Sequence, residues 1–228
     1  MKFLQNLYEL FYPSVCLACK DNLVDTNTHL CIHCRHDLPL TSFCNKTDNA
    51  LERSFFGRIR IDQATALLYY SKKGIVQELI HALKYKNQQS LGIFFGEWLG
   101  ANMMESQRFK NLEYIVPVPL DKKKQRNRGY NQLSVFGKSL AGKLKIPFIE
   151  NNLVKIVNTN SQTKKLRWER LKNVDENFKV LQPSKFENKQ ILLIDDIVTT
   201  GATIEACFEA LNKDCNLKIS LACIAFTK

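Results

Sequence analysis

The stretch that most restricts the fold of this chain runs from residue 191 to residue 203, Ile-Leu-Leu-Ile-Asp-Asp-Ile-Val-Thr-Thr-Gly-Ala-Thr. Four apolar residues, Ile191 to Ile194, are typical of a short buried strand. Two carboxylates and a turn of small residues follow, and apolar residues then recur at helical spacing from Ile204 to Leu211. The pattern predicts a strand, an acidic pair, a tight loop and a helix, in that order.

The start of the predicted helix is suited to an anion. The first N–H groups of a helix lack partners and lie at the positive end of its dipole, so a loop of small hydroxyl residues and glycine suits a phosphate. The carboxylates of Asp195 and Asp196 accept hydrogen bonds, and therefore suit sugar hydroxyls or a metal ion. Together these groups predict a ribose 5-phosphate site. The plainer alternative is an acidic N-cap before an ordinary helix. The predicted phosphate-binding residues are Thr199, Thr200, Gly201, Ala202 and Thr203.

A second strand, loop and helix lie in the middle of the chain. Residues 114–120 begin as a buried strand, and two prolines make the end of this strand leave the sheet. Residues 121–132 are strongly basic and precede a helix over 133–144. Arg128 and Gly129 are predicted to bind a diphosphate, because a guanidinium group and free backbone N–H groups both donate to phosphate oxygens. A solvated basic loop is the alternative.

Strand and helix patterns alternate from residue 64 to the end of the chain. Residues 64–70 and 217–226 are typical of apolar strands, 75–86 of a helix with an apolar stripe, and 146–149 of a further short strand. This alternation predicts an α/β fold with a mostly parallel sheet flanked by helices. The two loops described above are then expected to meet at the carboxyl edge of that sheet.

The front of the chain carries a candidate metal site. Cys16-Leu-Ala-Cys19 and Cys31-Ile-His-Cys34 are two C-x-x-C knuckles, which predict one closed, structural zinc site. Metal binding would supply much of the folding energy of so short a segment. Two disulfides or a redox pair are the alternatives, although disulfides fit poorly with a chain that lacks an export signal. Nearby residues that could replace a ligand are His29, His33, His36 and Cys44; the remaining cysteines, Cys207, Cys215 and Cys223, have no ligand spacing and are expected to be buried.

Charge differs between the two parts of the chain. The net charge is +11, and residues 1–60 hold seven Lys and Arg against six Asp and Glu, whereas residues 61–228 hold 26 against 16. The excess suits a polyanionic small substrate or nucleic acid. Residues 45–60 form a polar and basic connector, so we expect a zinc-binding module with its connector over 1–60 and a second domain over 61–228.

No sequence signal indicates export or membrane insertion. No apolar run approaches the roughly 20 residues of a membrane span. The first twelve residues are typical of a short amphipathic helix, but they carry Glu9 and lack a small-residue cleavage site, so they make a poor signal peptide. We therefore expect a cytoplasmic protein.

The motifs taken together resemble a known family. The string at 191–203 resembles the phosphoribosyl pyrophosphate signature of type I phosphoribosyltransferases. The double knuckle, Val-Pro-Val-Pro-Leu at 116–120 and Arg-Gly-Tyr-Asn-Gln at 128–132 resemble the ComF/GntX family, which is linked to DNA uptake in competence and to DNA utilisation. The resemblance covers nearly the whole chain. It implies a type I phosphoribosyltransferase-like sheet with a small N-terminal module that is similar to a zinc finger and of the double zinc-ribbon kind.

The resemblance also implies a substrate and roles for residues. Phosphoribosyl pyrophosphate and Mg²⁺ would bridge the two loops, with Asp195 and Asp196 as the catalytic pair. Lys84, near the end of its helix, would reach an anionic group, or would alternatively complement the helix dipole. A polar stretch at 158–177 resembles the mobile loop that closes over such sites. No stretch identifies the acceptor, so a non-catalytic accessory protein that binds single-stranded DNA and competence proteins, with the pocket as a nucleotide sensor, stays open.

Overall fold

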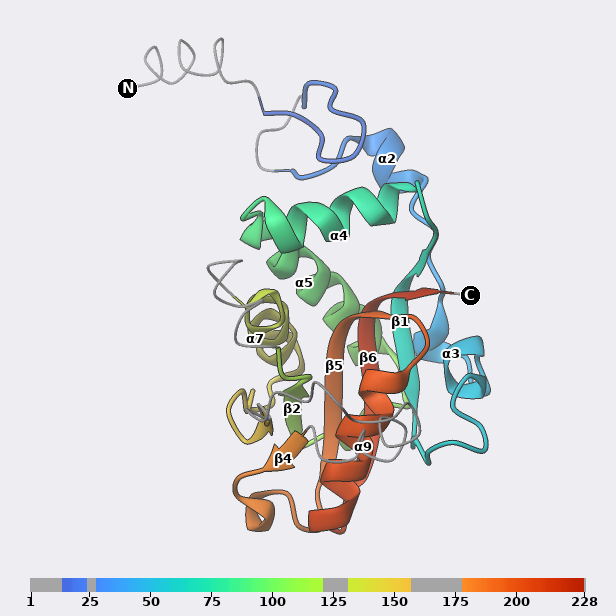
Figure 1. Ribbon diagram of the computed structural model, residues 1–228. Helices are drawn as coiled ribbons and strands as arrows, with labels where there is room; N and C mark the ends of the chain where they lie inside the picture. The colour runs from blue at the N-terminus through green and yellow to red at the C-terminus, as the bar shows by residue number, and fades with distance from the viewer. Residues whose placement is uncertain (1–13, 24–27, 121–130, 157–177, 228) are drawn as a thin grey trace, which may run out of the picture.

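A four-stranded parallel sheet forms the centre of the protein. The computed structural model describes residues 14–23, 28–120, 131–156 and 178–227 (Figure 1). The strands lie in the order β1, β6, β5, β2, and every neighbouring pair is parallel, which confirms the predicted α/β class. Helices cover both faces, so the strands are mostly apolar. The strands are β1 (Ala64–Tyr70), β2 (Tyr114–Pro117), β5 (Gln190–Val198) and β6 (Lys218–Thr227).

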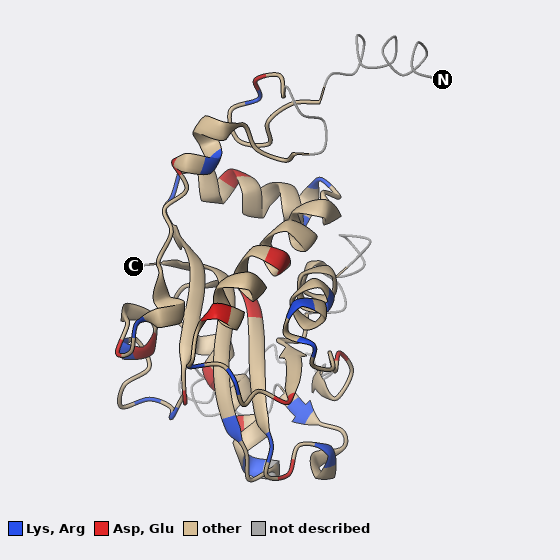
Figure 2. Cartoon of the chain, turned by 180° about the vertical axis from the view of Figure 1, so that it is seen from behind, with Lys and Arg blue, Asp and Glu red and all other residues tan. Residues whose placement is uncertain are grey.

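The helices lie on opposite faces of this sheet. In Figure 1, α9 (Ala202–Asp214) lies in front of the strands, whereas α5 (Gln89–Glu105) and α7 (Gln132–Leu144) lie on the other face, which Figure 2 shows from behind. α4 (Ile75–Tyr85) connects β1 to α5. None of the helices in the described ranges has the length and apolar character needed to cross a membrane.

A second, smaller sheet lies beside the first. It pairs β3 (Leu153–Lys155) with β4 (Phe178–Val180) in antiparallel fashion, and a short 3-10 helix, η3 (Pro183–Lys185), follows it. The strand predicted at 146–149 is reduced to a single bridge between Ile115 and Phe148. Pro147 has no N–H group to donate to a ladder, which limits the pairing there.

The stretch before β1 contains buried residues that its polar composition does not indicate. It forms α2 (Ile32–His36), η1 (Phe43–Asn45) and α3 (Ala50–Arg53). Leu51 and Phe55 are almost completely buried in the same core as the sheet. Much of the expected connector therefore packs on the sheet, and the division of the chain at residue 60 stays a prediction.

Candidate functional site

The loop between β5 and α9 has the predicted form. Thr199 and Thr200 are exposed, and Gly201 adopts a left-handed conformation with φ of 80°, which glycine tolerates best. Ala202 and Thr203, predicted to lie in the loop, form the first turn of α9, whose N-cap residue, Gly201, has no side chain to cap it. The hydroxyl oxygen of Thr200 accepts a long hydrogen bond, at 3.4 Å, from the N–H of Ala202. The N–H groups at its start are therefore suited to an anion.

The two aspartates lie on opposite faces of the sheet. β5 continues past them to Val198 because β6 continues to pair with it, so the strand is longer than the predicted 191–194 segment. Successive side chains of a strand point to opposite faces. Asp196 points toward α7, and Asp195 points toward α9, where its charge acts on the thiol of Cys207. The pair therefore offers two separate carboxylates rather than one double site.

Asp196 is held by protein groups on both of its oxygens. The Nζ atom of Lys84 in α4 lies 2.7 Å from its Oδ1, and the Nε2 atom of Gln132 in α7 donates to its Oδ2 at 2.7 Å. Its side chain is 7% exposed. Lys84, expected to contact an anionic ligand, is thus paired with a carboxylate. Gln132 ends the Arg-Gly-Tyr-Asn-Gln string, but its spacing alone did not indicate this contact.

The carboxyl of Asp195, unlike that of Asp196, has no charged side chain of the described residues bonded to it, and its pKa is raised. Its Oδ1 accepts one hydrogen bond, at 2.8 Å, from the backbone N–H of Asp196. Burial, together with the charge of Asp196, raises the pKa of the Asp195 carboxyl from 3.8 to about 8. A ligand that brings a cation or hydroxyl donors to this carboxyl would stabilise its ionised form. Asp195 is therefore the better suited of the two to contact a polar ligand.

The start of α7 differs from the start of α9. The side chain of Asn131 accepts a hydrogen bond from the N–H of Leu133 and so caps α7. Asn131 also donates to Glu150 at 3.2 Å. Of the two helix starts predicted to bind phosphate groups, that of α7 is capped by the side chain of its N-cap residue, whereas that of α9 is not. Arg128 and Gly129 lie outside the described residues, as does the whole of the loop predicted at 158–177.

Two residues from the stretch before β1 contact the phosphate loop. The Nη2 atom of Arg58 donates to the carbonyl oxygen of Thr200 at 2.9 Å, and its Nε atom forms an ion pair with Glu205 of α9. The ring of Phe55 lies so close to Gly201 that a Cβ atom there would be 2.6 Å from Cε1. Sequence analysis missed both residues, because no local pattern connects positions so far apart in the chain.

The four knuckle cysteines gather as predicted. Their sulfur atoms all lie within 4.8 Å of one another, and those of Cys19 and Cys31 are 3.8 Å apart. Zn–S bonds of about 2.3 Å in a tetrahedron place sulfur atoms about 3.8 Å apart. Burial acts to raise the pKa of Cys16, but backbone N–H donors outweigh it and bring that pKa to about 6. The arrangement is compatible with a metal ion, and the cysteines in the described ranges form no disulfide.

The alternative ligands have other neighbours. His29 packs edge-on against Phe94 of α5 with ring centroids 5.9 Å apart, and the thiol of Cys44 lies 3.2 Å from the hydroxyl of Thr65. Within the described part of the chain, the four knuckle cysteines form the group of His, Cys, Asp and Glu residues that could hold a metal. As predicted, Cys207, Cys215 and Cys223 are buried.

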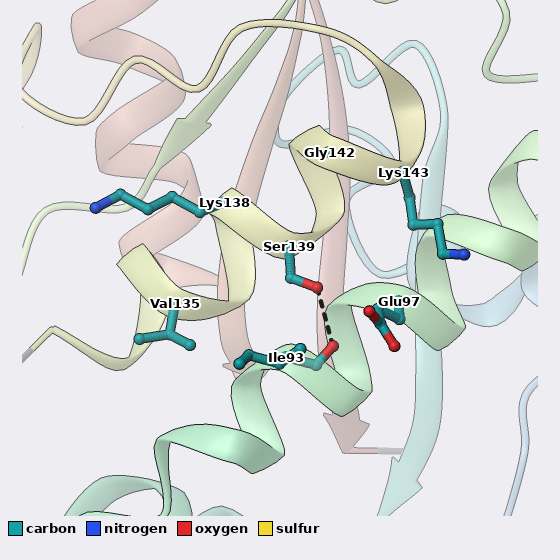
Figure 3. Close-up of a pocket in the computed structure, with 7 residues that line it drawn as sticks. All are labelled: Ile93, Glu97, Val135, Lys138, Ser139, Gly142 and Lys143. Carbon is teal, nitrogen blue, oxygen red and sulfur yellow. Dashed lines mark hydrogen bonds between the residues drawn. The ribbon is translucent and has the colours of Figure 1, made fainter.

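A groove between α5 and α7 lies apart from these residues. It has a volume of about 520 Å³, and the Ser139 hydroxyl donates across it to the Ile93 carbonyl oxygen at 3.0 Å (Figure 3). Its charged lining groups are Glu97, Lys138 and Lys143. None of its lining residues belongs to the predicted phosphate or metal sites, so it adds nothing to either.

Comparison with known proteins identifies the kind of domain. Residues 134–228 match the phosphoribosyl transferase domain family. The chain is 24% identical over 214 residues to Competence protein F of Haemophilus influenzae, covering 89% of this chain and 93% of that protein. It is 25% identical over 194 residues to Competence protein ComFC of Bacillus subtilis, covering 83% and 74% respectively.

A solved structure with similarity to this chain is adenine phosphoribosyl transferase from Trypanosoma brucei in complex with AMP, pyrophosphate and ribose-5-phosphate. The identity is 15%, the match covers 69% of this chain and 70% of that one, and the TM-score is 0.42. The relatives also include DNA utilization proteins. Residues 134–228 thus match the phosphoribosyl transferase domain family, and the chain is similar to competence and DNA-utilisation proteins, as its motifs predicted.

Proposed function

We propose that this protein binds a ribose 5-phosphate group, as phosphoribosyl pyrophosphate with Mg²⁺, where β5 meets α9. The observation that carries the proposal is the start of α9, where the N-cap residue is the left-handed Gly201, which has no side chain, and where two exposed threonines precede it. Backbone N–H groups of Thr203 and its neighbours would hold the phosphate, and the hydroxyls of Thr199 and Thr200 would add donors.

The carboxylates of β5 would then have different roles. We assign the ribose hydroxyls to Asp195, because burial leaves its ionised form without a strong partner. Asp196 would position the site by joining α4, α7 and β5 through Lys84 and Gln132. When bound, Mg²⁺ would neutralise charge on the pyrophosphate, and its ligands would be mainly oxygens of the substrate and water. The carboxyl of Asp195 is suited to a cation of this kind, because a nearby positive charge favours its ionised form.

The reaction that fits these residues is transfer of the phosphoribosyl group. Breaking the bond at the anomeric carbon leaves positive charge on the sugar ring, which a nearby carboxylate stabilises. Asp195 is the described residue placed to supply that charge. Arg128 and Gly129 retain their predicted role toward the pyrophosphate. No residue identifies the acceptor.

The metal of the N-terminal module is proposed to be zinc with a structural role. Four cysteines close a tetrahedral shell and leave no position for a substrate. The guanidinium of Arg35 lies 5.6 Å from the ring centroid of Trp98 in α5, so the metal-binding segment contacts the helix that packs on α7. Thiols that bind zinc need a reducing compartment, which supports the expected cytoplasmic location.

A second candidate function is binding without turnover. The segments 121–130 and 157–177 hold ten Lys and Arg against four Asp and Glu, more than half of the net charge of +11. Such segments suit the backbone of single-stranded DNA, and relatives named as competence proteins favour a role in DNA uptake. In this case the site at α9 would sense a nucleotide while the rest of the chain contacts DNA and partner proteins.

Calorimetry with phosphoribosyl pyrophosphate and Mg²⁺, together with an assay for released pyrophosphate, tests both candidates. A transferase binds the compound and releases pyrophosphate in the presence of its acceptor, and Asp195→Asn reduces that release. Binding without release across bases, amines and oligonucleotides favours the sensor. If the compound at millimolar concentration produces no heat of binding, the proposed site is wrong.

A further inference from the structure

The stretch before β1 forms a rigid segment beside the phosphate loop. The side chain of Asn49 caps α3, and Glu52 completes a capping box with it. The carboxylate of Glu52 also forms an ion pair with Arg108 and accepts a hydrogen bond from the N–H of Ala64 at 2.9 Å. Because these groups are buried or nearly so, α3 is held against β1 independently of the phosphate loop.

Arg58 extends from this segment to the phosphate loop and to α9. Its guanidinium donates at 3.0 Å to the carbonyl oxygen of Ser54 and at 2.9 Å to that of Thr200, and it pairs with Glu205. The same group lies over the ring of Phe55, with Cζ 5.8 Å from the centroid. One planar side chain thus connects the segment before β1, the phosphate loop and the start of α9.

Phe55 complements this contact through shape. Its ring fills the space beside the left-handed Gly201, where even a methyl group would clash. The hydrogen bond to the Thr200 carbonyl and the ring packed against Gly201 together restrict the backbone of residues 199–201. A loop that is already in its binding conformation loses less entropy when a ligand binds.

The positive charge of Arg58 also favours phosphate binding at the start of α9. Glu205 lies in the first turns of α9, where a phosphate would bind, and a free carboxylate there would repel it. The ion pair with Arg58 neutralises that charge. Arg58 therefore keeps the start of α9 positive without itself occupying the place of the phosphate.

We infer that Phe55 and Arg58 form a latch that holds the phosphate loop, residues 199–201, ready for a ribose 5-phosphate group, with Arg58 as a positioning residue. The inference rests on the proposed function for its ligand. The restraint of the loop by Phe55 and Arg58 does not depend on the ligand, so it can be tested separately in the free protein.

The test compares Arg58→Ala with Arg58→Lys and with a control, Arg53→Ala. Arg53 lies on the same stretch and pairs with the exposed Asp48 at 2.5 Å, but it does not contact the loop. Two measurements are made on each full-length protein: hydrogen exchange of the β5–α9 peptide without ligand, and calorimetry with ribose 5-phosphate and, separately, with pyrophosphate.

We expect Arg58→Ala to increase exchange at 199–205 and to weaken ribose 5-phosphate binding about tenfold, while pyrophosphate binding is unchanged. Arg58→Lys restores part of the affinity, because it keeps the charge and loses the planar fork. Arg53→Ala behaves as the unmodified protein. The thermal melting temperature of each variant confirms that it is folded.

Two outcomes would overturn the latch. If Arg58→Ala leaves exchange at 199–205 unchanged, the loop does not depend on Arg58, and any lost affinity means that Arg58 binds phosphate directly. If exchange increases but affinity for ribose 5-phosphate does not fall, the restraint has no role in binding. If the unmodified protein binds no ribose 5-phosphate, the proposed function fails, while the exchange data still decide whether Arg58 restrains the loop.

Discussion

Neighbouring substitutions at Asp195 and Asp196 should change stability in opposite directions. In the folded protein, burial raises the pKa of Asp195 from 3.8 to about 8. The folded state therefore binds a proton more tightly than the unfolded state, and stability falls as the pH rises from about 4 to about 8. Asp195→Asn removes this penalty and keeps the oxygen that accepts the N–H of Asp196. The variant should be more stable than the unmodified protein at pH 8.

The magnitude follows from the pKa. A change from 3.8 to about 8 corresponds to an upper limit of about 6 kcal/mol. Because Asp195 is only partly buried, we expect about a third of this, about 2 kcal/mol. In a protein of this size that raises the melting temperature by about 6 °C. The assay is thermal unfolding of both proteins without ligand between pH 5 and pH 8, and the difference should shrink toward pH 5.

Asp196→Asn is the matched comparison. It leaves the ammonium group of Lys84, whose side chain is 16% exposed, without its carboxylate, and should destabilise the protein by about 3 kcal/mol at neutral pH. If Asp195→Asn lowers the melting temperature at pH 8, or if its effect does not depend on pH, the assignment of a raised pKa to Asp195 is incorrect.

Two further substitutions and their controls test the loop and the metal site. Gly201→Ala should destabilise the protein by about 1–2 kcal/mol or more, because φ is 80° and the methyl group clashes with Phe55. The control, Gly142→Ala in α7, should stabilise it by about 0.5–1 kcal/mol, because a Cβ there meets no atom within 4 Å. Equal denaturation midpoints for these two variants would contradict the reasoning. Cys34→Ser should remove bound zinc, measured by atomic emission, because Cys34 belongs to the four-sulfur cluster. Cys44→Ser should retain one ion per chain, because Cys44 does not belong to that cluster. Retention of zinc by both variants would contradict the ligand assignment.

Several features of this protein were predictable from sequence because they depend on neighbours in the chain. The apolar run at 64–70 matches β1 residue for residue, and α4 begins at Ile75, as the apolar stripe predicted. The order of strand, loop and helix at 191–203 follows from a buried run, a glycine and small hydroxyl residues. Two C-x-x-C knuckles likewise specify their ligands, because a tight turn brings each pair of sulfurs together.

The extent of β5 and the facing of its aspartates were decided by the tertiary structure. β6 supplies partners as far as Val198, so the acidic pair lies inside a strand and alternates between faces. The contacts that distinguish these carboxylates join distant positions: Gln132 and Asp196 are 64 residues apart.

The latch joins positions that are farther apart still, since Arg58 and Thr200 are separated by 142 residues. Such contacts form only when folded elements pack together, so the local sequence around either residue does not predict its partner. The sequence by itself therefore determined which elements and ligands this protein has, whereas packing determined which carboxylate is held by protein groups and what restrains the phosphate loop.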